Sequence, residues 1–162
     1  MIMGNIQLTS DKRPASNCYF DTLPKSFRES ALLDRFHCFI EGWYLPRVNK
    51  SMIYKGWRLN TEYFSEIMHA LRTSTRQADL FDRLVEYQKD ADIRDFKAVK
   101  KTAVAYMKLL FPYWGSVGDV DTTLFNDYCL QPAVMRRGII KRQCHNIDPE
   151  FKTEMPDIRV RV

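Results

Sequence analysis

Several patterns that announce common functions are missing from this chain of 162 residues. Its four cysteines lie far apart and form no Cys-x-x-Cys pair, so neither a zinc ribbon nor a thioredoxin-type redox site is indicated. His37-Cys38 and Cys144-His145 are poor metal sites, because adjacent side chains in a strand point to opposite faces. We therefore expect no metal site, and we expect the reduced thiols of a cytoplasmic protein.

Long apolar runs are also missing. No stretch of about 18 apolar residues is present to span a membrane, so we expect no membrane partner. The N-terminal residues 1–6 have no basic region and soon turn polar, which is not the pattern of a secretory signal. Length and a hydrophobic content of 45% fit one ordinary globular domain, or a piece of one.

Self-contained catalytic motifs are absent too. None of the six glycines is followed by lysine, so the phosphate-cradling pattern Gly-x-x-x-x-Gly-Lys-Ser/Thr does not occur. The chain also lacks a Gly-x-Ser-x-Gly elbow, a His-Glu-x-x-His helix and a Gly-x-Gly-x-x-Gly turn. We expect that the chain alone is not an enzyme.

The charge that is present is mildly basic, with a net value of +5. Part of the excess gathers late in the chain, at Arg136, Arg137, Lys141 and Arg142. Such a cluster favours polyanions, so these four residues are candidate DNA contacts. The cluster has no interleaved aromatic residues, so a solvated helix face is the favoured explanation and contact with nucleic acid is the alternative.

Apolar spacing predicts a mainly α-helical chain with a few short strands. One helix should begin after Asn60, a good N-cap residue, and another after Asp92, ending at Phe111-Pro112. Further helices are expected over 24–34, over 77–89 and from 122 onward, with Pro132 kinking or restarting the last. Strands are expected at 1–6, at 36–40 and in the alternating segment 158–162.

Arg35 stands between a predicted helix and a short apolar run. An arginine at such a junction leaves a rigid edge, and its permanently charged fork suits phosphate recognition. Two structural alternatives remain open: Arg35 pairs with Glu41, or it caps the preceding helix by bonding its last carbonyl groups.

Arg94 falls in the first turn of the helix that follows Asp92. A cation is unfavourable at this positive helix end by up to about 1 kcal/mol, which hints at an anionic partner. A salt bridge with Asp90 or Glu62 is the structural alternative.

Three motifs occur in an order that resembles a known family. They are Gly4-Asn5, the run Leu32-Leu33-Asp34-Arg35-Phe36, and Arg94-Asp95 followed by Ala98-Val99 and Lys101. In this order they resemble the C-terminal part of the AAA+ ATPase module in Lon-like proteins of bacteriophage-exclusion (BREX) defence systems. That family in turn resembles the ring helicases that open replication origins. The resemblance spans roughly residues 1–148.

The resemblance implies roles for three residues and a division of the chain. Asn5 would be sensor 1, Arg35 the arginine finger that acts on a neighbouring subunit, and Arg94 sensor 2. Residues 1–58 would end the AAA+ α/β core, 59–145 would form the helical lid subdomain, and 146–162 would link to a Lon-like protease domain. The phosphate loop and the acidic Mg²⁺-binding strand would precede Met1.

The same resemblance sets expectations for cofactors and partners. ATP and Mg²⁺ are implied for the complete protein only, which would assemble as a homo-oligomeric ring. Trp57 and Arg58 are candidates for a subunit interface in such a ring. A small basic helical DNA-binding module is the alternative function, and a ring could also encircle DNA. An inactive product of a truncated gene is a third interpretation.

Overall fold

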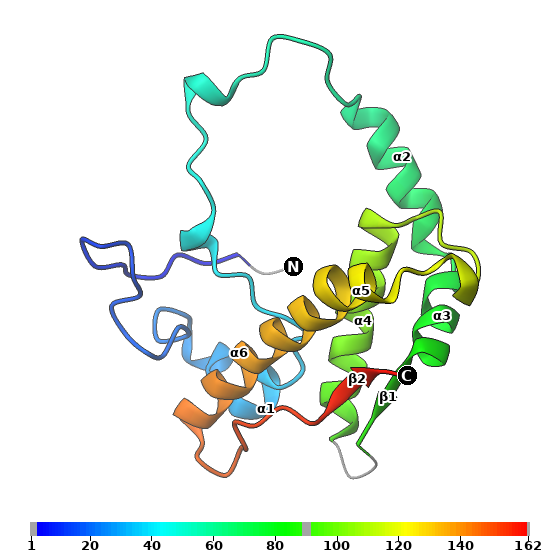
Figure 1. The fold of residues 1–162 in the computed structure, drawn as a ribbon. Helices are drawn as coiled ribbons and strands as arrows, with labels where there is room; N and C mark the ends of the chain where they lie inside the picture. Colours follow the sequence, from blue (N-terminus) through cyan, green and yellow to red (C-terminus); the bar gives the residue numbers. More distant parts are fainter. Residues whose placement is uncertain (1–2, 89–91, 162) are drawn as a thin grey trace.

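The computed structural model describes residues 3–88 and 92–161, which form a mainly helical protein with one small sheet (Figure 1). The helices named in Figure 1 are α1 (Ser30–Leu33), α2 (Thr61–Arg72), α3 (Arg76–Leu84), α4 (Ile93–Leu110), α5 (Thr122–Phe125) and α6 (Gln131–Ile147). The strands are β1 (Val85–Tyr87) and β2 (Ile158–Val160), which pair antiparallel with Val85 opposite Val160. Short 3-10 turns lie at Lys25–Phe27, Gly42–Tyr44, Lys50–Met52 and Val117–Asp119.

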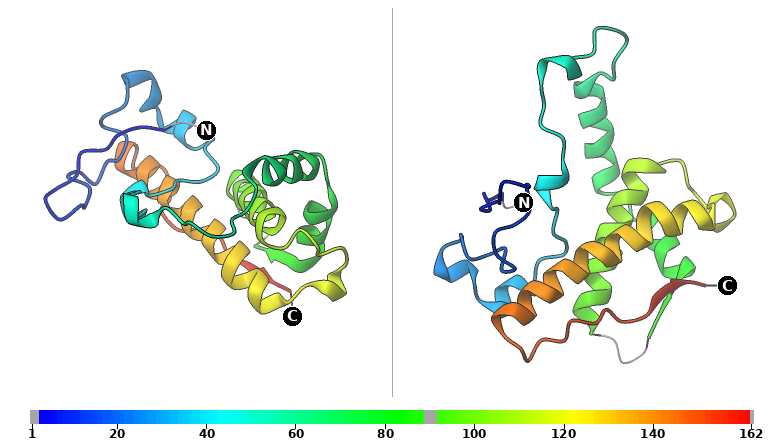
Figure 2. Two further views of the ribbon diagram at one scale, coloured as in Figure 1. Left: turned by 90° about the horizontal axis from the view of Figure 1, so that it is seen from above. Right: turned by 60° about the vertical axis from the view of Figure 1, so that its left-hand side comes forward.

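Helices α3, α4 and α6 form the body of the molecule. Helix α6 crosses α4, and α3 lies on another side of α4 (Figures 1 and 2). A π-helical turn at Asn126–Leu130 joins α5 to α6 without a break, and Pro132, which has no N–H to donate, is the second residue of α6. None of the described helices is long and apolar enough to cross a lipid bilayer.

The main core lies between these helices. The α4 residues Val99, Ala103 and Met107 recur at helical spacing and are completely buried, as are Phe81 of α3 and Phe125. Asp92 caps α4 by accepting a hydrogen bond from the Arg94 backbone N–H at 2.8 Å. The predicted helix after Asp92 is thereby confirmed.

A second, smaller core joins the N-terminal part of the chain to α6. Its buried members are Phe20, Leu33, Ile140 and Cys144. Phe36 and Phe39 pack against them, half-buried. The turn that carries Arg35 is therefore attached to α6.

The strand predictions for the N-terminal half are wrong where the structure describes them. Residues 3–7 and 36–40 are irregular, and the first two residues lie outside the described range. No strand lies beside 36–40 in the described chain, and Phe39 instead donates its N–H to the carbonyl of Arg136 at 3.4 Å. A short aromatic segment has the same composition whether it forms a strand or fills a side-chain cluster, so its sequence alone does not separate the two.

The helix predicted over 77–89 ends early, at Leu84. Val85 and Tyr87 continue the chain as β1, because the alternating end of the chain returns to pair with it. The prediction of a strand at this end is confirmed over Ile158–Val160. Ile158 is buried in the main core, so this part of the segment 146–162 packs on the helices.

Helix α2 begins where the sequence predicts. The Asn60 carboxamide oxygen accepts from the backbone N–H groups of Glu62 and Tyr63, at 2.9 and 3.2 Å. The apolar residues of α2 recur at helical spacing, which predicts a buried face; this prediction is wrong, since α2 contains no buried residue. Apolar spacing in the sequence predicts ten core residues, and the structure buries three of them, Leu84, Val99 and Ala103. Leu110 is exposed, and the other six are half-buried: Phe36, Phe39, Phe64, Ile67, Leu71 and Tyr106.

Candidate functional site

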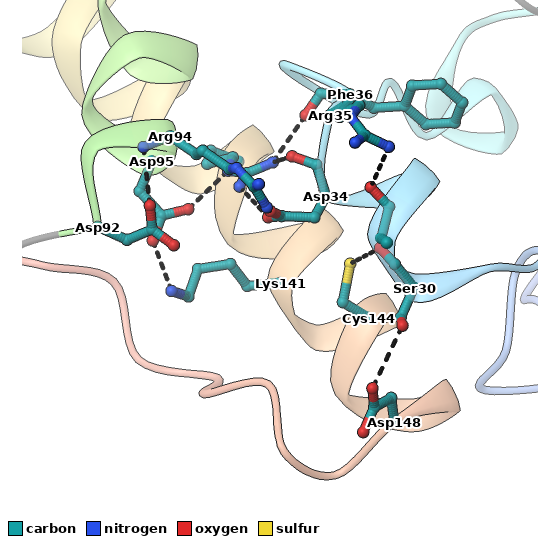
Figure 3. Close-up of polar contacts among 12 residues, drawn as sticks. Ser30, Asp34, Arg35, Phe36, Asp92, Arg94, Asp95, Lys141, Cys144 and Asp148 are labelled. Carbon is teal, nitrogen blue, oxygen red and sulfur yellow. Dashed lines mark hydrogen bonds and ion pairs between the residues drawn. The ribbon is translucent and has the colours of Figure 1, made fainter.

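Asp34, at the end of α1, is the centre of a network of ion pairs (Figure 3). One carboxylate oxygen accepts from the Nη1 of Arg94 at 2.7 Å, and the other accepts from the Nη2 of Arg137 at 2.5 Å. Arg94 comes from the first turn of α4 and Arg137 from the middle of α6. Asp34 thus joins the turn after α1 to both long helices.

Asp95 extends the network along α6. Its two carboxylate oxygens accept from Arg137 Nε at 2.8 Å and from Lys141 Nζ at 2.5 Å. Arg137 and Lys141 stand one helical turn apart, so their side chains share one face of α6. Two carboxylates therefore face two cations inside the molecule, and Arg94 adds a third from the surface.

Arg137 does not lie on a DNA-binding surface, so this part of the sequence prediction is wrong. The residue is completely buried, and Lys141 is turned toward Asp95 with its side chain only 13% exposed. Acids from α1 and α4 recruit these cations, because a buried charge needs a partner. Arg136 is half-buried and Arg142 is exposed; contact of these two with DNA stays a prediction.

The surroundings of Asp34 favour its ionised form. Burial raises the pKa of the Asp34 carboxyl, but hydrogen bonds and charges from Arg94 and Arg137 outweigh burial and hold the pKa below its ordinary value. Asp34 is therefore a carboxylate at neutral pH, and it remains paired with buried Arg137 even if Arg94 moves away.

Arg94 is the exposed member of the network. Its side chain is 54% exposed, and among the described residues it gives one nitrogen, Nη1, to Asp34. The salt bridge considered from the sequence with Glu62 is not formed, and Asp90 lies outside the described residues. A guanidinium group held on one side and open to solvent on the other can receive an anion.

Arg35 points away from the network at the same corner (Figure 3). Its Nη1 donates to the carbonyl of Ala31 at 3.2 Å, which confirms the alternative that Arg35 caps its own helix. Glu41 is not its partner; it instead accepts from the hydroxyl of Tyr19 at 3.4 Å. A single hydrogen bond on an exposed side chain is readily exchanged for another acceptor.

Asn5 lies in the irregular N-terminal segment, and its side chain is exposed. The hydroxyl of Thr22 donates to the Asn5 backbone carbonyl at 3.0 Å. In the part of the chain that the structure describes, no hydrogen bond links the Asn5 side chain to Arg35 or Arg94. The structure thus brings Arg35 and Arg94 to one corner and leaves Asn5 outside their network.

The sequence prediction missed three residues of the network. Asp34 and Asp95 were not predicted as site residues, and Arg137 was predicted as a DNA contact and not as a buried partner of these acids. A signal was present, because each acid stands beside a motif arginine, Asp34 before Arg35 and Asp95 after Arg94. The spacing of Arg137 and Lys141 also puts them on one helix face. The sequence does not reveal that these acids face that helix.

Metal ligation finds no geometric support in the described residues, which contain no group of three histidine, cysteine or acidic side chains able to hold an ion. Burial raises the pKa of the Cys129 thiol to about 12 and that of Cys144 to about 11, so neither is a ready ligand or nucleophile at neutral pH.

Comparison with known proteins now places the chain. The family model described as "Lon-like protease BrxL-like, ATPase domain" matches residues 1–157. The chain belongs to this family. The Lon-like protease BrxL of Escherichia coli O9:H4 (strain HS) is 26% identical over 143 residues, which are 88% of this chain and 20% of that protein. BrxL of Bacillus cereus (strain H3081.97) is 27% identical over 113 residues, 69% of this chain and 17% of that protein.

Membership of the BrxL-like family confirms the resemblance drawn from the three motifs. The chain spans about a fifth of the length of the BrxL relatives that it matches. The division into an AAA+ core and lid, and the roles of Asn5, Arg35 and Arg94, stay predictions.

Proposed function

We propose that this chain is the sensor- and finger-bearing part of a BrxL-type ATPase module, working in an ATP-driven ring of a phage-defence system. One observation carries the proposal: Asp34 joins exposed Arg94 to the turn of Arg35, although the two arginines are 59 residues apart in the sequence (94 minus 35). Membership of the BrxL-like ATPase family supports it.

The donors at this corner fit the phosphates of a nucleotide. A guanidinium group can donate two hydrogen bonds to one phosphate group. Because it has donors only, it cannot ligate a metal ion. In the complete assembly ATP and Mg²⁺ would supply the phosphoryl group and neutralise part of its charge. Arg35 would leave the Ala31 carbonyl to stabilise the charge that develops in the transition state, and Arg94 would hold the phosphates. Asn5 would orient the attacking water.

The chain is proposed to supply these residues without hydrolysing ATP by itself, because it contains no Gly-Lys dipeptide for a phosphate loop. Hydrolysis of ATP by the isolated 162-residue chain at an ordinary rate of about 1 per second or more would contradict this account.

The decisive experiment measures ATP hydrolysis by the protein purified from its native host with the chains that it assembles with, called here the native assembly. Arg35→Ala should lower kcat by about 10³-fold or more, the range known for arginine fingers. Arg72→Ala removes an exposed arginine from the end of α2 and is the matched control, expected to leave kcat unchanged. An unaltered kcat in Arg35→Ala would remove the finger role.

DNA binding is the second candidate function, and a different segment now favours it. Residues 44–60 run exposed outside the helical body and arch away from it in Figure 1. They contain no acid, and their four basic residues are Arg47, Lys50, Lys55 and Arg58. The exposed aromatic residues interleaved with them are Tyr44, Tyr54 and Trp57, which is 100% exposed. Basic and aromatic side chains in alternation bind phosphates and stack on bases.

Titration of the 162-residue chain with a fluorescent single-stranded oligonucleotide tests this candidate. The pair Lys50→Glu and Arg58→Glu should weaken binding by at least about tenfold and flatten its salt dependence. Lys25→Glu with Lys152→Glu changes the net charge equally at exposed positions elsewhere and should weaken binding far less. Equal losses in the two double variants would mean that general charge, not this segment, governs binding.

A further inference from the structure

Arg137 makes an unusual set of hydrogen bonds for a buried arginine. Besides the carboxylates of Asp34 and Asp95, its Nη1 donates to two backbone carbonyls, that of Asp34 at 2.8 Å and that of Phe36 at 2.7 Å. The guanidinium thus donates four N–H groups, one to Asp95, 42 residues away in the sequence, and three to Asp34 and Phe36, 103 and 101 residues away. A buried side chain that makes four hydrogen bonds is held in a single conformation.

The two carbonyls belong to the residues on either side of Arg35. The Asp34 carbonyl belongs to the peptide group before Arg35, and the Phe36 carbonyl belongs to the peptide group after Phe36, so the two hydrogen bonds restrain the short stretch of backbone formed by Arg35 and Phe36. The Arg35 side chain itself is exposed and has one exchangeable bond to Ala31. The corner therefore combines a restrained backbone with an exposed cationic side chain that one exchangeable hydrogen bond holds.

Stability alone does not require such an arrangement. Burying an ion pair costs as much desolvation as it regains in attraction, and well-packed apolar residues often serve as well. What apolar side chains cannot do is bind the two carbonyls beside Arg35. The bonds to these carbonyls give Arg137 a role that concerns Arg35.

We infer that Arg137 is a positioning residue for Arg35. Its fork holds the carbonyls of Asp34 and Phe36, and Asp95, itself held by Lys141, holds the fork in turn. The arginine that reaches a neighbouring nucleotide is thereby attached to α6 and, through Asp95, to α4. This inference rests on the proposed function of Arg35.

Arg137→Lys is the informative variant, because it keeps a positive charge between two carboxylates and loses the fork. A lysine ammonium has three donors at one point and cannot reach both carbonyls and both carboxylates together. In the native assembly we expect kcat for ATP hydrolysis to fall by about tenfold or more, since a 1 Å misplacement can cost ~100-fold, while KM changes less than about twofold. Arg83→Lys makes the same change at an exposed position of α3 and should alter neither constant.

The double variant Arg35→Ala with Arg137→Lys separates positioning from general damage. If Arg137 acts through Arg35, adding Arg137→Lys to Arg35→Ala lowers kcat no further. A further loss equal to that of Arg137→Lys alone would overturn the inference and leave the finger role intact. An unchanged kcat in Arg35→Ala alone would instead refute the proposed function.

Amide hydrogen exchange in the 162-residue chain supplies a measurement that needs no activity. The N–H groups of Arg35 and Phe36 donate to the carbonyls of Leu32 and Leu33, at 3.1 and 2.9 Å. Arg137→Lys should speed exchange at these two amides by about tenfold while amides in the middle of α4 keep their rates. Unchanged exchange at Arg35 and Phe36 in a folded Arg137→Lys protein would show that the fork does not hold this turn, and would overturn the inference.

Discussion

Asp34 and Arg137 are 103 residues apart in the sequence, yet the guanidinium of Arg137 binds both the carboxylate and the carbonyl of Asp34. One residue thereby receives two hydrogen bonds from the same buried side chain. Asp34 also accepts from exposed Arg94, so a single carboxylate connects α1, α4 and α6. The free energy of unfolding of the chain should therefore depend on the contact between Asp34 and Arg137.

Arg137→Met should destabilise the chain strongly. Removing the cation leaves Asp34 and the nearly inaccessible Asp95 without their buried partner, and breaking such a pair costs about 3–5 kcal/mol in the free energy of unfolding. Urea unfolding followed by circular dichroism measures this loss. Arg142→Met, at an exposed position of the same helix, should change the free energy by less than about 0.5 kcal/mol. Similar losses in both variants would show that the network contributes little.

The low pKa of Asp34 predicts an acid-dependent part of the stability. Since the folded pKa lies below the unfolded value of 3.8, the unfolded chain binds more protons as pH falls, and folding loses free energy. The contribution is complete above the unfolded pKa and disappears as pH falls through the folded pKa. Asp34→Asn should flatten the decline of unfolding free energy below about pH 5. Asp11→Asn, in an exposed loop, serves as control; an equal effect of both variants would refute the prediction.

His37 should add a second pH dependence, at milder pH. Burial lowers the pKa of His37, and the positive charges of Lys101 and Arg137 lower it further; Lys101 Nζ lies 3.2 Å from its Nε2. The unfolded histidine therefore binds a proton at a higher pH than the folded one, and stability falls as pH drops below about 6.5. His37→Gln should remove this fall between about pH 7 and pH 5, measured by urea unfolding. His69→Gln, exposed on α2, should leave the fall in place, and a fall that persists in His37→Gln would contradict the assignment.

Local sequence patterns predicted the helices well, because their causes are local. The Asn60 and Asp92 caps and the stripe through Val99 and Ala103 act within a few turns of chain. The boundary between α3 and β1 depends instead on a partner strand 73 residues later, as in the pair of Glu86 with Arg159. Periodicity inside a short window cannot contain that information.

The candidate site shows the same division. Arg35 and Arg94 were found because their neighbours in the sequence form motifs, and the family match confirms the family that these motifs indicated. Arg137 was misjudged as a DNA contact, because a basic cluster looks alike whether it faces solvent or buried acids. Only the fold shows that Asp34 and Asp95 face α6.

The cysteines provide a test of how firmly α1 is attached to α6. Cys129 and Cys144 are buried, and burial raises their pKa values to about 12 and about 11, whereas Cys18 and Cys38 are partly exposed. Iodoacetamide at about pH 8 should therefore modify Cys38 at least about 100-fold faster than Cys144 in the folded chain. Peptide mass spectrometry measures both rates, and denaturing urea should abolish the difference.

Cys144 is the informative thiol, because its Sγ lies 3.8 Å from the carbonyl of Ser30, on the helix that leads to Asp34 and Arg35. Separation of α1 from α6 would uncover this sulfur on the side of Ser30, and it would also separate Asp34 from Arg137. Labelling of Cys144 should thus accelerate in Arg137→Met under conditions where Arg142→Met remains protected. If Cys144 reacted as fast as Cys38 in the unaltered chain, the turn that carries Arg35 would not be held by α6 at all.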